Sequence, residues 1–488
     1  MDDSKHATRK VIPIRPQAGW VPGAARKDPA NETVWLYEAQ QKIHPRSVSG
    51  RFTNWRWALV FLTQLVFYGL PWLQWGQRQA VLFDLGARRF YIFNLVLYPQ
   101  DFIYLTGILV ISALSLFLFT AIAGRLWCGF ACPQTVYTEI FLWIEKTIEG
   151  DRSARLRRDG ARLSADNVLR KSAKHLVWLA VAAWTGFTFV SYFTPLRELG
   201  AEFLQWHMSS WEVFWTIFYG VASYGNAGFM REQVCKHMCP YARFQSAMFD
   251  HDTLIVTYDA QRGEPRGGRS RSVDPVALNL GACIDCTLCV QVCPTGIDIR
   301  KGLQYECIGC GACADVCDSV MDKMGYARGL VKYSTQNAVK ERWSAAQTRR
   351  HVLRPRVLVY TAILGAVVLA MGISLVMRTP FKVDVVRDRG ALARIVAGGP
   401  IENVYRLQLM NATEANQRYR VSVQGLAGLA VNSEDTFEVA ATQSRWIAVR
   451  VQLPYEGAPP GSHAIHFDIQ AAGSADHVSE KSVFLVPR

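Results

Sequence analysis

The sequence predicts a multi-domain membrane protein with about five transmembrane helices, a cysteine-rich insert and an all-β C-terminal sandwich. Three observations predict this architecture. Apolar segments long enough to cross a bilayer recur along the chain, eight cysteines fall into two runs of identical spacing, and short alternating strands fill residues 381–488. At 488 residues the chain has room for several domains, and its 50% hydrophobic content suits a membrane protein with soluble parts.

Five apolar segments are long enough to span about 30 Å of hydrocarbon at a rise of about 1.5 Å per residue. They cover residues 57–75, 102–124, 175–193, 211–230 and 357–377. The fourth is the weakest because Gly220, Gly225 and Asn226 interrupt it, and an interfacial helix is its alternative. Residues 81–98 are also apolar but carry three charges, each costly at the bilayer centre, so we expect an interfacial or re-entrant loop there.

Lysine and arginine alternate in number between the spans. Residues 1–56 carry ten, 77–101 three, 146–174 nine, 194–210 one and 231–356 eighteen. The positive-inside rule then places the N-terminus and the cysteine-rich insert in the cytoplasm, and the C-terminal domain in the periplasm, of a bacterial inner membrane. The net charge of +14 is therefore an orientation signal and a contact for the lipid bilayer, and it does not indicate nucleic-acid binding.

Two cysteine runs, thirteen residues apart, share the spacing C-x2-C-x2-C-x3-C. Such runs bind [4Fe–4S] clusters in bacterial ferredoxins, where the fourth cysteine of one run binds the other cluster. We therefore predict one cluster on Cys283, Cys286, Cys289 and Cys317, and a second on Cys293, Cys307, Cys310 and Cys313. Zinc knuckles and disulfides are the alternatives, but zinc sites usually use two C-x2-C pairs, and the patterned cysteines suit a reducing compartment.

A second pattern, C-x3-C-P, occurs twice, each time directly after a predicted span. It comprises Cys128, Cys132, Cys235 and Cys239, and we call the two segments the first and second corner. A helix should begin at each proline, and its N-terminus should lower the pKa of the preceding thiol. If the corners pack together, four thiolates converge, with His237 and Met238 as further ligands, and such a soft site selects Cu(I), zinc or an iron–sulfur cluster. Ordinary packing and disulfides are the alternatives.

The composition changes after Pro380. Seven short runs of alternating residues lie between residues 382 and 486, and turn-prone residues separate them. This pattern predicts a β-sandwich. We expect His463, His466 and His477 to be solvated surface residues, because the odd spacing of the first two puts them on opposite faces of a regular strand.

Five short motifs go beyond generic ferredoxin spacing. They are residues 42–46 with 50–52, 128–134, 231–235, 239–245 and 262–267. Together they resemble the CcoG/FixG family, also called RdxA or RdxB, from about residue 35 to the end. These are membrane polyferredoxins that serve assembly of the cbb-class cytochrome c oxidase. The resemblance implies an immunoglobulin-like C-terminal domain outside the membrane and the reduction of Cu(II) to Cu(I). His44 and His237 stand where the family pattern has tyrosine.

These observations predict five regions. Residues 1–56 form a cytoplasmic segment, disordered over 1–35, and residues 57–249 hold four transmembrane helices and the two corners. Residues 250–355 form a ferredoxin-like domain with two [4Fe–4S] clusters, residues 356–378 a fifth transmembrane helix, and residues 379–488 the periplasmic Ig-like sandwich.

The resulting hypothesis is a cupric reductase. A cytoplasmic donor would reduce the clusters, and the electron would reach copper at the four catalytic cysteines of the corners. A copper chaperone or oxidase assembly factors would then receive the ion. A quinol-linked electron-transfer subunit is an alternative, with the aromatic residues 206–219 as its quinone-site candidate. A non-catalytic assembly scaffold with structural clusters is another.

Overall fold

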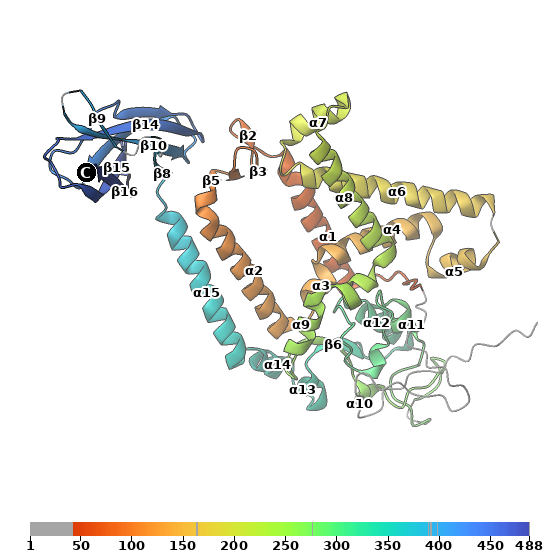
Figure 1. The fold of residues 1–488 in the computed structure, drawn as a ribbon. Coiled ribbons are helices and arrows are strands. Elements are labelled where there is room, and N and C mark those ends of the chain that lie inside the picture. The colour runs from red at the N-terminus through yellow and green to blue at the C-terminus, as the bar shows by residue number, and fades with distance from the viewer. Residues whose placement is uncertain are drawn as a thin grey trace, which may run out of the picture. The chain divides into compact units, whose positions relative to one another are not determined.

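A computed structural model describes residues 42–487 apart from residues 163, 276, 389, 391, 392 and 398 (Figure 1). The segment predicted to be disordered, residues 1–35, lies outside the described residues. Residues 44–49 form no regular structure and lead into helix α1 (Arg51–Gly69).

In the described part of the chain, three helices are long and apolar enough to cross a membrane. They are Pro99–Ala123, which includes α2 (Phe102–Ala123), α6 (Ala165–Val190) and α15 (Pro355–Val376). Helices α2 and α15 pack side by side (Figure 1). These helices suggest association with a membrane.

The prediction of five spans is wrong for the other two segments. Helix α1 ends at Gly69, so residues 70–75 of the predicted span 57–75 lie outside it. The helix instead begins with a polar turn that holds Arg51, Asn54 and Arg56, and Arg56 is buried in an ion pair with Glu139. Helix α8 (Ser210–Gly225) has only 16 residues, because the backbone passes into a π-helical turn, η3 (Asn226–Met230). By length and composition, neither reaches what a span requires.

The segment expected as an interfacial or re-entrant loop is a small antiparallel sheet. Strands β3 (Val81–Asp84), β4 (Arg89–Ile92) and β5 (Leu95–Leu97) pair in sequence order, after a hairpin of β1 (Gln74–Trp75) and β2 (Arg78–Gln79). Asp84 and Arg89 face each other in the register where β3 turns into β4. The charges that argued against a span therefore flank a tight turn.

Helices and one π-helical turn surround the two corners. They are α3 (Leu126–Phe130), α4 (Pro133–Glu149), α5 (Arg152–Gly160), the turn η4 (Val234–Met238) and α9 (Pro240–Met248). Helix α7 (Leu196–Gln205) instead joins α6 to α8. Phe141 of α4 stacks on Trp178 of α6 with ring centroids 5.1 Å apart, and Ala227 completes their buried cluster. This packing fixes α4, which follows the first corner, against η3, which precedes the second.

The cysteine-rich insert is closed by a two-stranded antiparallel sheet of β6 (Ile255–Tyr258) and β7 (Val331–Ser334). Between these strands lie α10 (Ala260–Gly263), α11 (Leu288–Gln291), η5 (Ile299–Lys301) and α12 (Ala312–Met324); α13 (Gln336–Lys340) and α14 (Ala345–Val352) follow. Val256, Met321 and Leu330 form its buried core. The pairing of β6 with β7 thus brings the two ends of the insert together.

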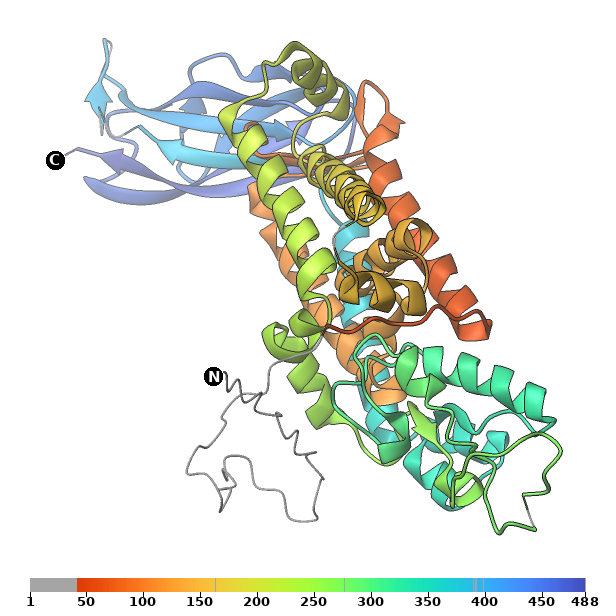
Figure 2. The ribbon, with the colours of Figure 1, turned by 90° about the vertical axis from the view of Figure 1, so that its right-hand side faces the viewer.

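The C-terminal region consists of two sheets, seen as two layers of strands in Figure 2. One has the order β12-β14-β10-β8, with β9 on β10, and the other β13-β11-β15-β16. The strands are β8 (Phe381–Arg387), β9 (Arg394–Ile395), β10 (Ile401–Asn411), β11 (Gln417–Gln424), β12 (Ala430–Val431), β13 (Thr436–Val439), β14 (Ser444–Leu453), β15 (Gly461–Ala471) and β16 (His477–Val486). Alternate residues such as Leu407 and Phe467 fill the core. Each of the seven predicted runs coincides with one of these strands, although the run 436–440 extends one residue beyond β13. The two-residue strands β9 and β12 were not predicted because they are too short to show alternation.

Candidate metal centres and thiol site

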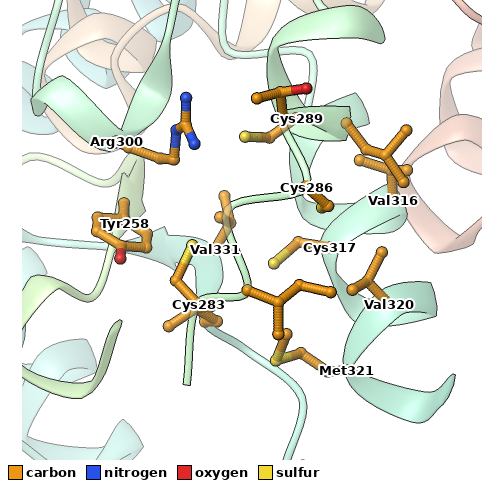
Figure 3. A pocket seen from close by; sticks show the side chains of 14 residues that line it. Tyr258, Cys283, Cys286, Cys289, Arg300, Val316, Cys317, Val320, Met321 and Val331 are labelled. Carbon is orange, nitrogen blue, oxygen red and sulfur yellow. The ribbon is translucent and has the colours of Figure 1, made fainter. Parts of the chain in front are cut away.

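The first cavity lies between the loop that precedes α11 and helix α12. The cysteines that line it are Cys283, Cys286, Cys289 and Cys317. Figure 3 shows these four side chains around one space, with Tyr258 and Arg300 at its side. The remaining walls are mostly apolar, with Val320 and Met321 from α12. The set is the one that the spacing assigns to one cluster, and ligation itself stays a prediction.

The second cavity adjoins the first. It is lined by Cys293, Cys307, Cys310 and Cys313, with Cys289 contributing to its wall as well. Each cavity has one buried cysteine, Cys283 in the first and Cys310 in the second, but of these eight cysteines Cys286 of the first cavity alone is exposed. The first cavity is therefore the one nearer to solvent.

The two cysteine loops share one backbone geometry. In the first, Asp285 and Thr287 have positive φ angles of 51° and 58°; in the second, Gly309 and Gly311 have 66° and 72°. These residues stand two and four positions after the first cysteine of each run. Alternating left-handed residues turn successive N–H groups toward one concave side, which suits an anionic group, and the N–H of Gly309 donates to Cys307 Sγ over 3.4 Å.

The donor set of these cavities fits two [4Fe–4S] clusters. Each cavity offers four thiols from loops of equal winding, and such clusters are held by four thiolates. Burial raises the pKa of Cys289 to about 11 and the pKa values of Cys307 and Cys317 to about 12. The metal-free thiols therefore hold their protons at neutral pH, and ligation must displace them.

The two corners differ in local structure. Cys128 lies in α3 and Cys132 directly precedes α4, whereas Cys235 lies in η4 and Cys239 directly precedes α9. A helix begins at each proline, as the pattern predicts. The second corner is π-helical, since the Cys239 N–H donates to the carbonyl of Val234 over 2.8 Å.

The expected lowering of the Cys132 pKa is wrong. Burial raises this pKa and outweighs the hydrogen bonds from the backbone of Gln134 and Thr135. Burial likewise raises the pKa of Cys128 to about 12 and that of Cys235 to about 11. A sequence can show that a helix begins beside a thiol, but it does not show how deeply that thiol is buried from solvent.

The corners pack against each other. Gln134, two residues after Cys132, donates to the carbonyls of Asn226 and Arg231 over 3.0 and 3.1 Å. The Cys128 thiol donates to Gln245 Oε1 in α9 over 3.1 Å. Negative charge on Cys239 would raise the pKa of each of the other three corner thiols. In the described residues, however, no three His, Cys, Asp or Glu side chains form a group that could hold a metal ion, and His237 and Met238 are exposed.

The first corner also touches the second cavity. Cys128 and Cys235 pack on a buried cluster that includes Ile308 and Cys310. A Cβ on Gly129 would lie 2.7 Å from the carbonyl oxygen of Ile308 and 2.8 Å from the Gly309 backbone. Glycine is therefore required where the corner meets the loop between Cys307 and Cys310.

Arg125 lies where the corners and the second cavity meet. It is 4% exposed, donates hydrogen bonds to the carbonyls of Tyr305 and Ala242, and leaves Nε without a partner. Burial lowers the pKa of its guanidinium, which negative charge on Cys128, Cys307, Cys235 and Cys239 would raise. It forms no ion pair with a described carboxylate, so the anions within its reach are the sulfurs of these cysteines once they lose their protons on binding a metal.

A buried charge network supports the second corner. Glu145 of α4 bonds Arg231 over 2.6 Å and Arg155 of α5 over 2.7 Å. Nearby, Lys174 pairs with Glu149 over 2.9 Å. Sequence reasoning missed Arg125, Gly129 and this network; the available signal was an arginine placed at the end of each apolar segment before a corner.

Family models match three parts of the chain. Residues 230–336 match a 4Fe-4S dicluster domain, and residues 105–149 match a 4Fe-4S binding domain. Residues 371–487 match the Ig-like fold at the C-terminus of FixG. Fold, cavities and matches define a FixG-like iron–sulfur electron-transfer protein with ferredoxin domains, an Ig-like domain and apolar helices that suggest a membrane location.

Curated relatives then show the family. Protein RdxB of Cereibacter sphaeroides is 39% identical over 83% of this chain and 87% of its own length. Nitrogen fixation protein FixG of Rhizobium meliloti is 37% identical over 80% of each chain, and RdxA of Cereibacter sphaeroides is 37% identical over 88% of this chain and 93% of its own. The chain belongs to the FixG/RdxA/RdxB family, which confirms the resemblance found in its motifs.

Proposed function

We propose that this protein reduces Cu(II) to Cu(I) at its two corners for assembly of a cbb-class cytochrome c oxidase. The observation that carries the proposal is the packing of Cys128 and Cys235 on the buried cluster that contains Cys310. Because the thiol site and the electron-storing site share one packed core, an electron can pass between them without a conformational change.

Bound [4Fe–4S] clusters would supply one-electron storage, at potentials within about −700 to +450 mV. Cys283, Cys286, Cys289 and Cys317 would hold one, and Cys293, Cys307, Cys310 and Cys313 the other. The chain itself supplies apolar walls that keep water out, and the buried Arg125 guanidinium, which favours negative charge at Cys307 and at the corner thiols.

Copper is the substrate. Cu(II) takes up one electron and becomes Cu(I), the protein loses the electron that its donor supplied, and each thiol that binds Cu(I) as a thiolate releases one proton. Thiolates select Cu(I) over harder ions, so product binding favours the reduction. A pair of thiolates suffices for Cu(I), so Cys128 with Cys132, or Cys235 with Cys239, can bind it without a preformed four-sulfur site.

The proposed location follows the charge distribution. The corners and the cysteine-rich insert face the cytoplasm, where a donor reduces the protein, and the Ig-like domain faces the periplasm. A copper chaperone or an oxidase assembly factor would accept the Cu(I).

An anaerobic assay tests the proposal. Purified protein is reduced chemically, freed of reductant and mixed with Cu(II), and Cu(I) is measured with a chromogenic chelator. We expect Cys128→Ser/Cys235→Ser, which leaves neither pair of thiols intact, to lose most of the Cu(I) formed, while the control His466→Ala/His477→Ala, in the C-terminal domain, behaves as wild type. Equal Cu(I) formation by the corner variant would contradict the copper site and favour a scaffold or a quinol-linked role.

A further inference from the structure

A broad polar hollow of about 620 Å³ lies beside the two cysteine cavities. Its walls come from α5, η4 and the segment from Thr287 to Glu306. Arg152, Lys236, Arg300, Lys301, Asp298 and Glu306 are its charged residues. Neither the copper site nor the ligation of the clusters uses this surface.

The hollow shares walls with both cavities. Thr287 and Arg300 line the hollow and the first cavity, while Thr295 and Ile297 line the hollow and the second. Thr295 Oγ1 lies 3.3 Å from Cys293 Sγ. A molecule seated in the hollow is thus separated from either set of cysteines by about one layer of side chains.

The hollow carries an excess of positive charge. Arg300 is neutralised by Asp298, with Nε 2.8 Å from Oδ1, and it also pairs with Asp285. Arg152, Lys236 and Lys301 form no ion pair with a described carboxylate, and only Glu306 of the lining opposes them. Three cations against one carboxylate attract an acidic partner and raise its rate of association.

We propose that this hollow is the docking site of the electron donor, a small acidic carrier protein that delivers one electron at a time. The inference rests on the proposed electron-transfer function and names the surface and the chemistry of the partner. Complementary charge would orient the carrier so that its redox group faces the shared walls.

The shape and chemistry of the hollow favour a protein over a small organic ligand. Small-molecule sites are lined mostly by apolar side chains and enclose their ligand. Here the lining is mostly polar, and it includes Thr287, the chain neighbour of Cys286, which is itself exposed. An anionic lipid headgroup would meet the same cations, and the experiment separates the two.

The test uses the full-length protein with its clusters, in nanodiscs of zwitterionic lipid. A plant-type [2Fe–2S] ferredoxin, reduced photochemically, is the probe, and stopped-flow absorbance gives the second-order rate constant of cluster reduction. The test variant is Arg152→Glu/Lys301→Glu. The control Lys323→Glu/Lys340→Glu removes the same charge from exposed positions outside the hollow. Cluster content is matched by iron, sulfide and visible absorption.

At low salt we expect the rate constant to fall about tenfold in the test variant and to stay within about twofold of wild type in the control. At high salt, where charge is screened, the rate constants of all three proteins should become equal. If the double variant does not retain clusters, Arg152→Gln and Lys301→Gln are measured singly and should each lower the rate. Equal rates in test and control variants would overturn the proposal. So would an unchanged rate with loss of binding to phosphatidylglycerol vesicles, which would assign the hollow to lipid.

Failure of the copper proposal gives a different result. Wild-type protein is reduced with methyl viologen, freed of the viologen and mixed with Cu(II) in a separate experiment. Absence of Cu(I) there, with salt-dependent reduction by ferredoxin intact, would overturn the copper function and keep the docking site.

Discussion

Arg231 Nη2 lies 2.6 Å from Glu145 Oε1, with the two side chains 7% and 1% exposed. This pair joins the helix that follows the first corner to the residue that opens the second. Arg231 has a φ of 37°, which is unfavourable for a side-chain-bearing residue, and its Nε donates to the carbonyl of Gly228 over 2.9 Å. The buried pair therefore holds a strained backbone four residues before Cys235.

Replacing Glu145→Gln should destabilise the protein by about 3 kcal/mol, because it leaves Arg231 and Arg155 buried without their carboxylate. The denaturation midpoint in detergent, followed by tryptophan fluorescence, measures the loss. Asp166→Asn, which removes an exposed partner of Arg158 and Arg170, is the control and should change the midpoint little. Equal midpoints for the two variants would show that the network is not stabilising.

Gly129→Ala should separate the first corner from the second cavity. The new methyl group would overlap the backbone at Ile308 and Gly309, at a cost of about 1–3 kcal/mol. We expect less iron bound per protein and slower Cu(I) formation. Gly200→Ala in α7 is the matched control, since nothing lies within 4 Å of its added Cβ. Wild-type iron content and rate in Gly129→Ala would contradict the close contact.

Arg125→Gln should lower the midpoint potential of the cluster on Cys307 by tens of millivolts. The buried guanidinium favours the more negative, reduced state, and charges interact strongly where water is excluded. A redox titration followed by electron paramagnetic resonance measures the shift, with Arg125→Lys restoring part of it. The exposed Arg350→Gln is the control. Unchanged midpoint potentials in Arg125→Gln would show that the guanidinium does not influence the cluster on Cys307.

Cu(I) affinity should rise with pH. Burial raises the pKa of Cys128 to about 12 and that of Cys235 to about 11, so both thiols are protonated between about pH 6 and 8 and Cu(I) must displace their protons. Each displaced proton makes the affinity about tenfold higher per pH unit. Competition with a chelator of known pH dependence measures the slope, which should fall in Cys128→Ser if that thiol binds. A flat profile in wild type would mean that Cu(I) binds elsewhere.

Local spacing predicted much of this molecule. The C-x2-C-x2-C-x3-C runs divide eight cysteines into two sets, and the structure places each set around its own cavity. Alternation predicted the long strands of the sandwich, and Pro133 and Pro240 predicted where α4 and α9 begin. These features depend on neighbours in the chain, which a sequence displays directly.

Features that depend on tertiary contact were beyond the sequence. The sign of the Cys132 pKa shift follows from its burial, and the shortness of α8 follows from a backbone change at Asn226. Gly129 lies against the backbone of Gly309, although the two residues are 180 positions apart in the chain (309 − 129). Apolar composition alone also made α1 resemble a span, although it buries Arg56 against Glu139.

The most direct test of the account is a single-turnover measurement with chemically reduced protein under anaerobic conditions. Cluster reoxidation and Cu(I) formation are followed together after mixing with Cu(II), in wild type and in Cys128→Ser/Cys235→Ser. If the clusters pass electrons to copper at the corners, the two signals have equal rates in wild type, one Cu(I) forms per electron lost, and the variant loses both signals. Reoxidation by Cu(II) at the wild-type rate without these two thiols would contradict it.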